Sequence, residues 1–135
     1  MRKQVELYES SGGKEGYLLE GTDMPCVLFT HIGVKSGALR KTPVMRVEVD
    51  GAYVLIGSMG GQPQNPAWVA NLRASPDITL RDREQVFEMT VREVDDPAER
   101  EKLWAAAVAA YPDYDAYQAK TDRVIPVFVA EPRPN

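Results

Sequence analysis

The chain has 135 residues, a net charge of −4, 44% hydrophobic and 27% charged residues, which is typical of one soluble globular domain. The acidic balance argues against nucleic-acid binding through phosphate neutralisation, and no apolar run approaches the roughly 20 residues of a membrane-spanning helix. One cysteine, Cys26, excludes an internal disulfide and suits the reducing cytoplasm. The sequence also has a single histidine, His31. One cysteine and one histidine are too few ligands for a structural zinc ion, so we expect no metal site.

The first predicted element is a polar arm over residues 1–25, interpreted as a short helix or extended arm followed by a loop. Strands are then predicted from β-rich composition, alternation and bounding turns at 26–30, 42–49, 53–57, 77–81, 86–94 and 124–130. Asp50-Gly51 indicates a tight hairpin between the second and third of these strands. Pro126 predicts that the last strand lies at a sheet edge or a bulge.

Two helices are predicted between the strands. In the first, Asn65 is the expected N-cap and Pro66 the first helical residue, and the helix ends at Ser75-Pro76. The second begins at Asp96, with Glu99 placed as in a capping box, and ends at Pro112. About six antiparallel strands with two or three short helices predict a mainly β (α+β) fold, a small β-barrel with helical plugs.

The most informative stretch is a basic, glycine-punctuated loop that runs into a strand. Between residues 33 and 47 there are four cations and no acid: Lys35, Arg40, Lys41 and Arg46. An acidic chain that concentrates positive charge in this way is expected to hold an anion there, because Arg and Lys supply fixed donors to phosphate or carboxylate. A solvated hairpin tip is the alternative.

Residues 57–61 form a second motif, Gly-Ser-Met-Gly-Gly, directly after an apolar strand. Such a turn leaves backbone N–H groups open to the edge of a planar ring or to a phosphate. It matches neither a dinucleotide-binding fingerprint nor a Walker A loop, and an ordinary glycine turn stays open as the alternative.

Two aromatic groups complete the candidates. Trp68 and Asn71 lie three residues apart on the first predicted helix, where they would form a ligand wall, or a buried tryptophan against the barrel. Tyr111, Tyr114 and Tyr117 are spaced to share one helical face, where phenols would line a substrate pocket and donate protons; a structural aromatic cluster is the alternative.

Taken in order, three stretches resemble the deazaflavin-dependent nitroreductase family, enzymes that use coenzyme F420 on a split β-barrel fold. They are GVKSGALRKTPVMRV (33–47), GSMGGQPQNPAWVANL (57–72) and AYPDYDAYQAKTDRVIPVFV (110–129). The resemblance implies one split-barrel, deazaflavin-binding domain over 1–135, with a variable N-terminal arm over 1–25.

The resemblance also implies a role for individual residues. The phosphate and oligoglutamate tail of the cofactor would be held by Lys35, Ser36, Arg40 and Lys41, next to Val34. The cofactor would run along Thr42, Pro43, Val44 and Met45. The ring edge would bond to Ile56, Gly57, Ser58, Met59 and Gly60, and the other side would be closed by Ala67, Trp68 and Asn71. The three tyrosines would lie over the substrate pocket, and Tyr114 among them would also contact the cofactor. Two positions depart from the family: Val34 replaces an Arg, and His31 stands where a hydroxyl residue is common.

The expected reaction is hydride transfer from F420H2 to an electron-poor C=C (an enone, quinone or lactone) or to a nitroaromatic substrate. Tyr114 first and Tyr111 second would hydrogen-bond the acceptor oxygen, Tyr117 would line the pocket, and Ser58 would polarise the same group or anchor the ring.

Several alternatives stay open. The chain could be an FMN-dependent split-barrel oxidoreductase, a non-catalytic deazaflavin carrier, or a protein that binds lipid or makes a weak peripheral membrane contact. We expect a small hydrophobic or electron-poor substrate, no nucleic acid, a cytoplasmic location, and a monomer or homodimer.

Overall fold

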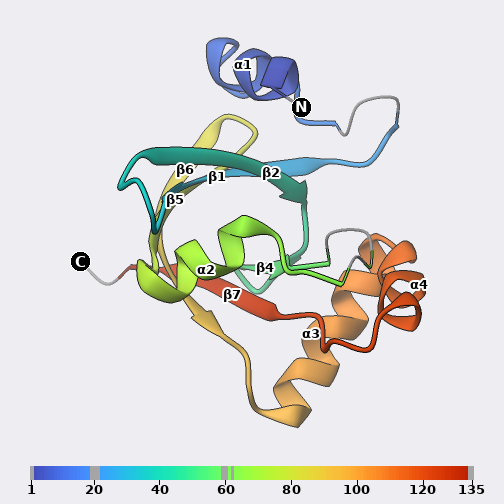
Figure 1. Cartoon of the computed structure of the whole chain (residues 1–135). Helices are drawn as coiled ribbons and strands as arrows, with labels where there is room; N and C mark the ends of the chain where they lie inside the picture. Colours follow the sequence, from blue (N-terminus) through green and yellow to red (C-terminus); the bar gives the residue numbers. More distant parts are fainter. Residues whose placement is uncertain (1, 19–21, 59–60, 62, 134–135) are drawn as a thin grey trace.

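The computed structural model describes residues 2–18, 22–58, 61 and 63–133, and its centre is one strongly curled antiparallel sheet (Figure 1). The strand order is β2-β1-β5-β6-β7-β4-β3. The strands are β1 (Cys26–Ile32), β2 (Leu39–Met45), β3 (Glu48–Val49), β4 (Ala52–Ile56), β5 (Asp77–Asp82), β6 (Gln85–Glu93) and β7 (Val127–Pro132).

The two edge strands, β2 and β3, are the two halves of one bent segment. β2 pairs with β1, and the pairing is extended by the Arg46 N–H, which donates to the Pro25 carbonyl at 2.9 Å. β3 pairs with β4, and the Val54 N–H donates to the Val47 carbonyl at 2.8 Å. The segment therefore connects the two edges of the curled sheet. The predicted split barrel of about six strands is confirmed, with one predicted strand divided at its bend.

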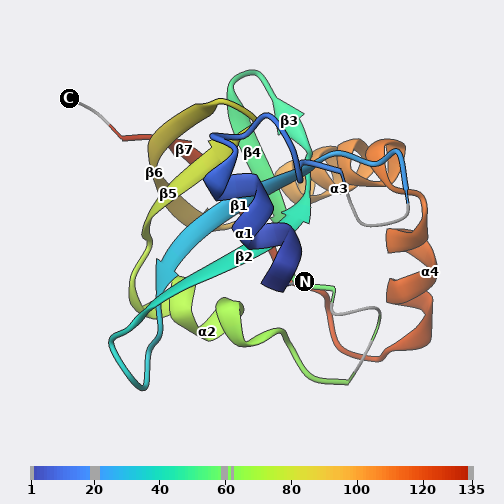
Figure 2. The same ribbon diagram turned by 90° about the horizontal axis from the view of Figure 1, so that it is seen from above.

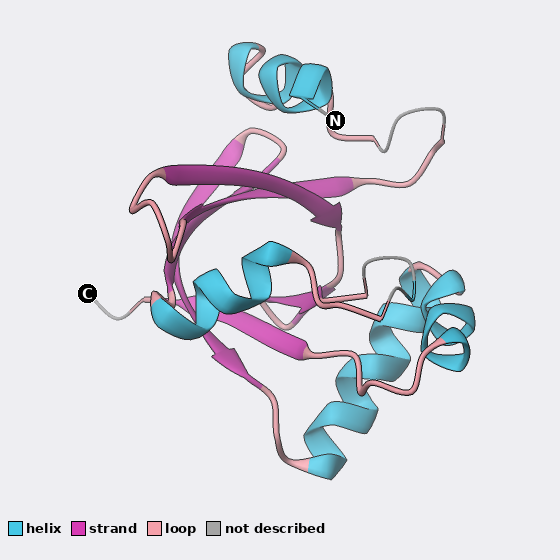
Figure 3. Cartoon of the chain, in the orientation of Figure 1, coloured by secondary structure: helices cyan, strands magenta, loops and turns pink. Residues whose placement is uncertain are grey.

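Within the described residues, four helices pack around the sheet (Figure 3). They are α1 (Arg2–Ser10), α2 (Ala67–Ala74), α3 (Pro97–Ala110) and α4 (Asp113–Lys120). Seen from above, α1 lies across β1 and β2, and Tyr8 anchors it there: the ring is fully buried and its hydroxyl donates to the Cys26 carbonyl at 3.1 Å (Figure 2). Within the described ranges no helix is long and apolar enough to cross a membrane.

Two buried clusters make the core. One fills the barrel beneath α2 and includes Phe29, Leu55, Leu80 and Phe128. The other lies between the opposite side of the sheet and the pair α3 and α4, and includes Cys26, Met45, Val54, Leu103 and Tyr114. Because neighbouring residues of a strand point to opposite faces, Val54 and Leu55 enter different clusters.

Local sequence signals explain several element ends. Asp50 and Gly51 have φ values of 52° and 84°, the positive values that a two-residue hairpin turn requires, as predicted. Asp96 caps α3, since its Oδ2 accepts from the Glu99 N–H at 2.9 Å, also as predicted. Pro112 divides the last helical region, because its ring is tolerated at the start of α4 but not inside a continuous helix.

Two local predictions are wrong. The residue before α2 is Pro66 rather than Asn65, and the Asn65 side chain accepts a hydrogen bond from Arg123 instead. β7 is not an edge strand, because it pairs with both β4 and β6. Pro126 precedes its first residue, so the missing N–H breaks no bond of the ladder.

Candidate functional site

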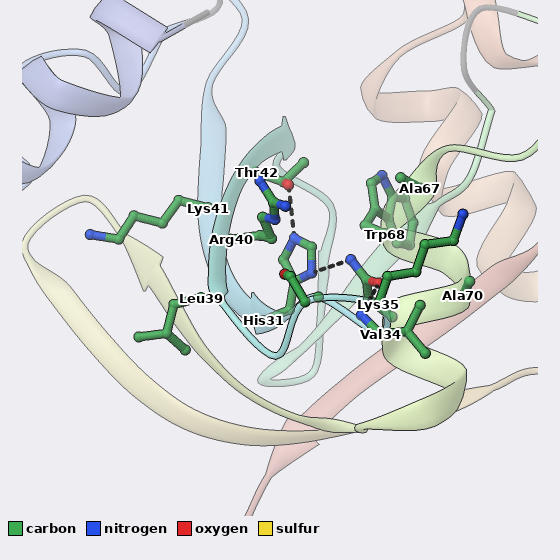
Figure 4. A pocket seen from close by; sticks show the side chains of 13 residues that line it. His31, Val34, Lys35, Leu39, Arg40, Lys41, Thr42, Ala67, Trp68 and Ala70 are labelled. Atoms are coloured by element: carbon green, nitrogen blue, oxygen red, sulfur yellow. Dashed lines mark hydrogen bonds between the residues drawn. The ribbon is translucent and has the colours of Figure 1, made fainter.

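An open cleft of about 1020 Å³ lies between the β1–β2 connection and α2 (Figure 4). Nine of the residues predicted for the cofactor site line it: Val34, Lys35, Ser36, Arg40, Lys41, Thr42, Ala67, Trp68 and Asn71. Four residues that were not predicted for it complete the wall: His31, Gly33, Leu39 and Ala70. The structure thus brings together the basic loop and the Trp68 helix, two motifs that are far apart in the sequence.

The four cations of the basic stretch differ in whether they have an acidic partner. Lys41 donates to Glu9 of α1 at 2.6 Å, and its side chain is directed away from Arg40 and Thr42 (Figure 4). Arg46 makes two bonds to Asp82, at 3.0 and 2.9 Å. Among the described residues no acidic partner pairs with Lys35 or Arg40, so these two leave uncompensated positive charge at the cleft.

A chain of hydrogen bonds crosses the floor of the cleft. The Val34 N–H donates to Asn71 Oδ1 at 2.8 Å, Asn71 Nδ2 lies 3.2 Å from His31 Nδ1, and His31 Nε2 lies 2.9 Å from Thr42 Oγ1. The His31 ring is 3% exposed. Burial, and secondarily the charge of Arg40, lowers the pKa of His31 to about 4, so the ring is neutral at pH 7. From the sequence, His31 is the single histidine and a departure from the family, with no predicted place in the cleft.

Trp68 belongs both to the core and to the cleft. Its side chain is 7% exposed, and its ring packs edge-on against Phe29 at 5.4 Å and tilted against Phe128 at 5.8 Å. The expected buried tryptophan is therefore present, and the same residue lines the cleft together with Asn71 one turn later. The ligand wall stays a prediction for this residue.

The glycine turn after β4 is tightly packed. Ile56, Gly57 and Ser58 are buried, and they do not line the cleft. A Cβ on Gly57 would lie 2.9 Å from Val69 Cγ2, so glycine lets the strand end approach α2 closely. The predicted contacts Met59 and Gly60 lie outside the described residues.

Arg123 holds this turn in place, a role that sequence analysis missed. Its guanidinium donates to the Gly57 carbonyl at 3.1 Å, to the Ser58 carbonyl at 2.7 Å and to Asn65 Oδ1 at 2.8 Å. Arg123 lies in the third stretch that carries the family resemblance. The signal that could have found it is a forked, charged donor placed directly before the last apolar strand.

The three tyrosines come together, although not on one helical face. Tyr111 follows α3, whereas Tyr114 and Tyr117 lie on α4. The hydroxyls of Tyr111 and Tyr117 are 2.9 Å apart, and the Tyr114 ring packs edge-on against Tyr111 at 5.0 Å. Tyr114 is 5% exposed, and burial raises its pKa, while the hydrogen bond with Tyr117 raises the pKa of Tyr111. Both phenols are therefore neutral at pH 7.

The strand β2 connects the cleft with the tyrosines. Pro43 and Val44 are half-buried and do not line the cleft, and Met45 belongs to the same buried cluster as Tyr114. Gly61 also packs closely against α4, since a Cβ on this residue would lie 2.7 Å from the Tyr117 carbonyl oxygen. The predicted residues thus form a cleft and a neighbouring aromatic cluster, joined by β2 and the glycine turn.

One known protein family matches nearly the whole chain. Residues 1–132 match the model of the F420H(2)-dependent quinone reductase family. The chain belongs to this family. Membership in the quinone reductase family confirms, at the level of the family, the predicted enzyme class, an F420H2-dependent reductase, and the predicted cofactor, coenzyme F420.

Individual relatives of this quinone reductase family member cover nearly the whole chain. The F420H(2)-dependent quinone reductase Rv1261c of Mycobacterium tuberculosis is 30% identical over 132 residues, which are 96% of this chain and 87% of the relative. A solved F420-H2 dependent reductase (FDR-A) is 46% identical with a TM-score of 0.75, covering 84% of this chain and 99% of its own. A second structure, described as a domain-swapped dimer, is 44% identical with a TM-score of 0.78 and 96% coverage of both chains.

More distant structures share the fold alone. A Listeria innocua protein described as a pyridoxamine 5'-phosphate oxidase is 9% identical with a TM-score of 0.58, covering 81% of this chain and 84% of its own. The barrel is therefore common to proteins of different sequence, so the fold alone does not identify the function.

Proposed function

We propose that this protein binds F420H2 in the cleft and reduces an electron-poor, hydrophobic acceptor, with a quinone as the favoured substrate class. The observation that carries the proposal is the uncompensated positive charge of Lys35 and Arg40 beside the wall formed by α2. Enones, lactones and nitroaromatic compounds are the other acceptors to be screened, because each accepts a hydride at an electron-poor centre.

The residues of the cleft fit such a cofactor. A long anionic tail needs cations without acidic partners, which Lys35 and Arg40 provide, and Ser36 adds a hydroxyl beside them. Because Lys41 is bonded to Glu9, we infer that it contributes less to the tail than the other two cations. A volume of about 1020 Å³ suits a cofactor of this size. When bound, the reduced deazaflavin supplies the hydride.

The chain's own contribution to the reaction is a neutral phenol. We infer that Tyr114 hydrogen-bonds the acceptor oxygen, with Tyr111 second, Tyr117 lining the pocket, and Ser58 polarising the same group. Among the described residues nothing accepts a hydrogen bond from the Tyr114 hydroxyl, and burial keeps this phenol protonated, which supports a donor role.

Titration of the purified protein with oxidised F420 and, in parallel, with FMN tests the cofactor. Cofactor fluorescence is followed at low and at moderate salt. Tight binding of F420 that weakens with salt is expected, because Lys35 and Arg40 act on an exposed anionic tail. Preference for FMN, whose tail is one phosphate, or binding of neither, would overturn the proposal.

Steady-state reduction of a soluble quinone tests the phenol. Tyr114→Phe should lower turnover at least tenfold and leave the affinity for F420 nearly unchanged. Tyr53→Phe is the matched control, since the Tyr53 hydroxyl donates to Asp82 at 2.6 Å outside the cleft. Unaltered turnover of the Tyr114 variant would remove that residue from the mechanism.

We further propose that the whole chain acts as one cytoplasmic domain and forms a homodimer, a proposal supported by the similar structure described as a domain-swapped dimer. Light scattering after size-exclusion chromatography measures the mass in solution, and a monomeric mass would contradict the dimer. Co-sedimentation with liposomes tests the remaining alternative, a weak peripheral membrane contact.

A further inference from the structure

The backbone N–H of Val34 determines which atoms donate and which accept in the hydrogen bonds on the floor of the cleft. A backbone N–H can only donate, so the Val34 N–H, at 2.8 Å, identifies the atom of Asn71 that faces it as the amide oxygen. The Asn71 NH2 group then faces His31 Nδ1, at 3.2 Å. Because this NH2 group can only donate, Nδ1 must be the unprotonated nitrogen of the ring.

The same direction continues to Thr42. A neutral imidazole carries one proton, which must sit on Nε2 when Nδ1 accepts. His31 Nε2 therefore donates to Thr42 Oγ1 over 2.9 Å. The Thr42 hydroxyl accepts this bond and keeps its own hydrogen, and among the described residues the bond with His31 is the one that this hydroxyl makes.

Thr42 and its neighbours present donors to the same cleft. Residues 40 and 42 are two apart on β2 and so share a face, and His31 pairs across the ladder with Arg40. Thr42, Arg40 and Lys35 all line the cleft, and each has donors but no acidic partner among the described residues. An anionic oxygen is the ligand group that this set of donors fits.

We propose that His31 is a positioning residue which, as the Nε2–H tautomer, makes the Thr42 hydroxyl a hydrogen-bond donor to an anionic oxygen of the cofactor's tail. The inference rests on the proposed F420 site and specifies how the chain recognises the tail there. Asn71 of α2 bonds both to this ring and to the Val34 N–H. The same chain of hydrogen bonds therefore also holds the loop that carries Lys35 against α2. Protonation of Nδ1 would break this order, and burial with the nearby Arg40 charge opposes it.

The tautomer is measured on the free protein, before any cofactor is added. The chain has one histidine, so a long-range ¹H–¹⁵N correlation spectrum contains one imidazole ring. At pH 7 we expect a neutral ring with its proton on Nε2. A proton on Nδ1, or a charged ring, would overturn the proposal whether or not F420 binds.

Binding of oxidised F420 to variants tests the role of the hydroxyl. Thr42→Val should weaken binding tenfold or more, the usual effect of losing a hydrogen bond to a charged group. Because the hydroxyl is uncharged, this variant should keep the salt dependence of the wild type, whereas Arg40→Gln should reduce it. Thr90→Val is the matched control, since the Thr90 hydroxyl bonds to Asp77 instead. An unchanged affinity of Thr42→Val would overturn the proposal.

A double-mutant cycle separates positioning from general damage to the fold. His31→Leu removes the donor to Thr42, so adding Thr42→Val to it should weaken F420 binding by less than about threefold. His31→Gln keeps an N–H donor near Nε2 and should restore most of the affinity. Full additivity in the cycle, or a His31→Gln variant as weak as His31→Leu, would contradict the positioning role. If the wild type binds no F420, the proposed function fails, while the tautomer measurement still decides the His31 arrangement.

Discussion

The buried imidazole of His31 makes the stability of the protein depend on pH in a defined window. In the unfolded chain this ring takes up a proton near its ordinary pKa of 6.5, but in the folded protein its pKa is about 4. Between these values the unfolded chain binds more protons, so its population rises as the pH falls. The contribution of His31 is therefore fully present above pH 6.5 and is lost progressively as the pH drops towards 4.

The size of the effect follows from the two pKa values. From pH 7.5 to pH 5, the shift of His31 lowers the free energy of unfolding by about 2 kcal/mol, roughly 6–10 °C in melting temperature for a chain of this size. Urea denaturation at both pH values measures it, with His31→Gln as the reference that lacks the imidazole. Glu93, whose pKa is lowered by Arg73, loses its ion pair only at more acidic pH and does so in both proteins.

Equal pH dependence of wild type and His31→Gln between pH 7.5 and 5 would mean that the folded protein does not hold this ring neutral. Titration of the ring by NMR gives the same answer without a variant. We expect no protonation of the folded protein down to about pH 5, and a midpoint near 6.5 would contradict the burial argument.

Three further substitutions have separable effects. Arg123→Met should lower the free energy of unfolding by about 2 kcal/mol, because three hydrogen bonds of its guanidinium are lost, whereas Arg40→Met should weaken F420 binding without lowering stability. Thermal melts and fluorescence titrations measure both, and equal destabilisation by the two variants would count against the assignment. Tyr53→Phe should cost about 1–2 kcal/mol in urea denaturation, because buried Asp82 loses a donor. Asp96→Ala should lower stability by about 1 kcal/mol through loss of the α3 cap, and an unchanged melting temperature would show that the cap is dispensable.

Features that depend on adjacent residues could be predicted from the sequence. The Asp50-Gly51 turn needs only two residues with positive φ, and the cap of α3 needs only Asp96 three residues before an N–H. The residues of the cleft were predicted from the family resemblance. The resemblance indicates which distant parts of the chain meet, and the spacing of residues along the sequence does not. Even so, the resemblance could not say which cations keep a free charge.

The features that the sequence could not show depend on partners far along the chain. Lys41 meets Glu9 and Arg46 meets Asp82, pairs separated by 32 and 36 residues. Alternation along β2 places Lys41 and Arg40 on opposite faces, but only the register of the sheet shows which face the cleft occupies. Arg123 was missed for the same reason, since its acceptors lie 58 to 66 residues earlier.

The position of β7 has a consequence for how the protein must be made. β7 (Val127–Pro132) follows both β4 and β6 in the chain, yet it pairs with β4 on one side and β6 on the other. Until it emerges, a nascent chain carries two unpaired, apolar strand edges, and the barrel cannot close. A chain in which β7 has not yet docked would therefore expose both edges to other chains.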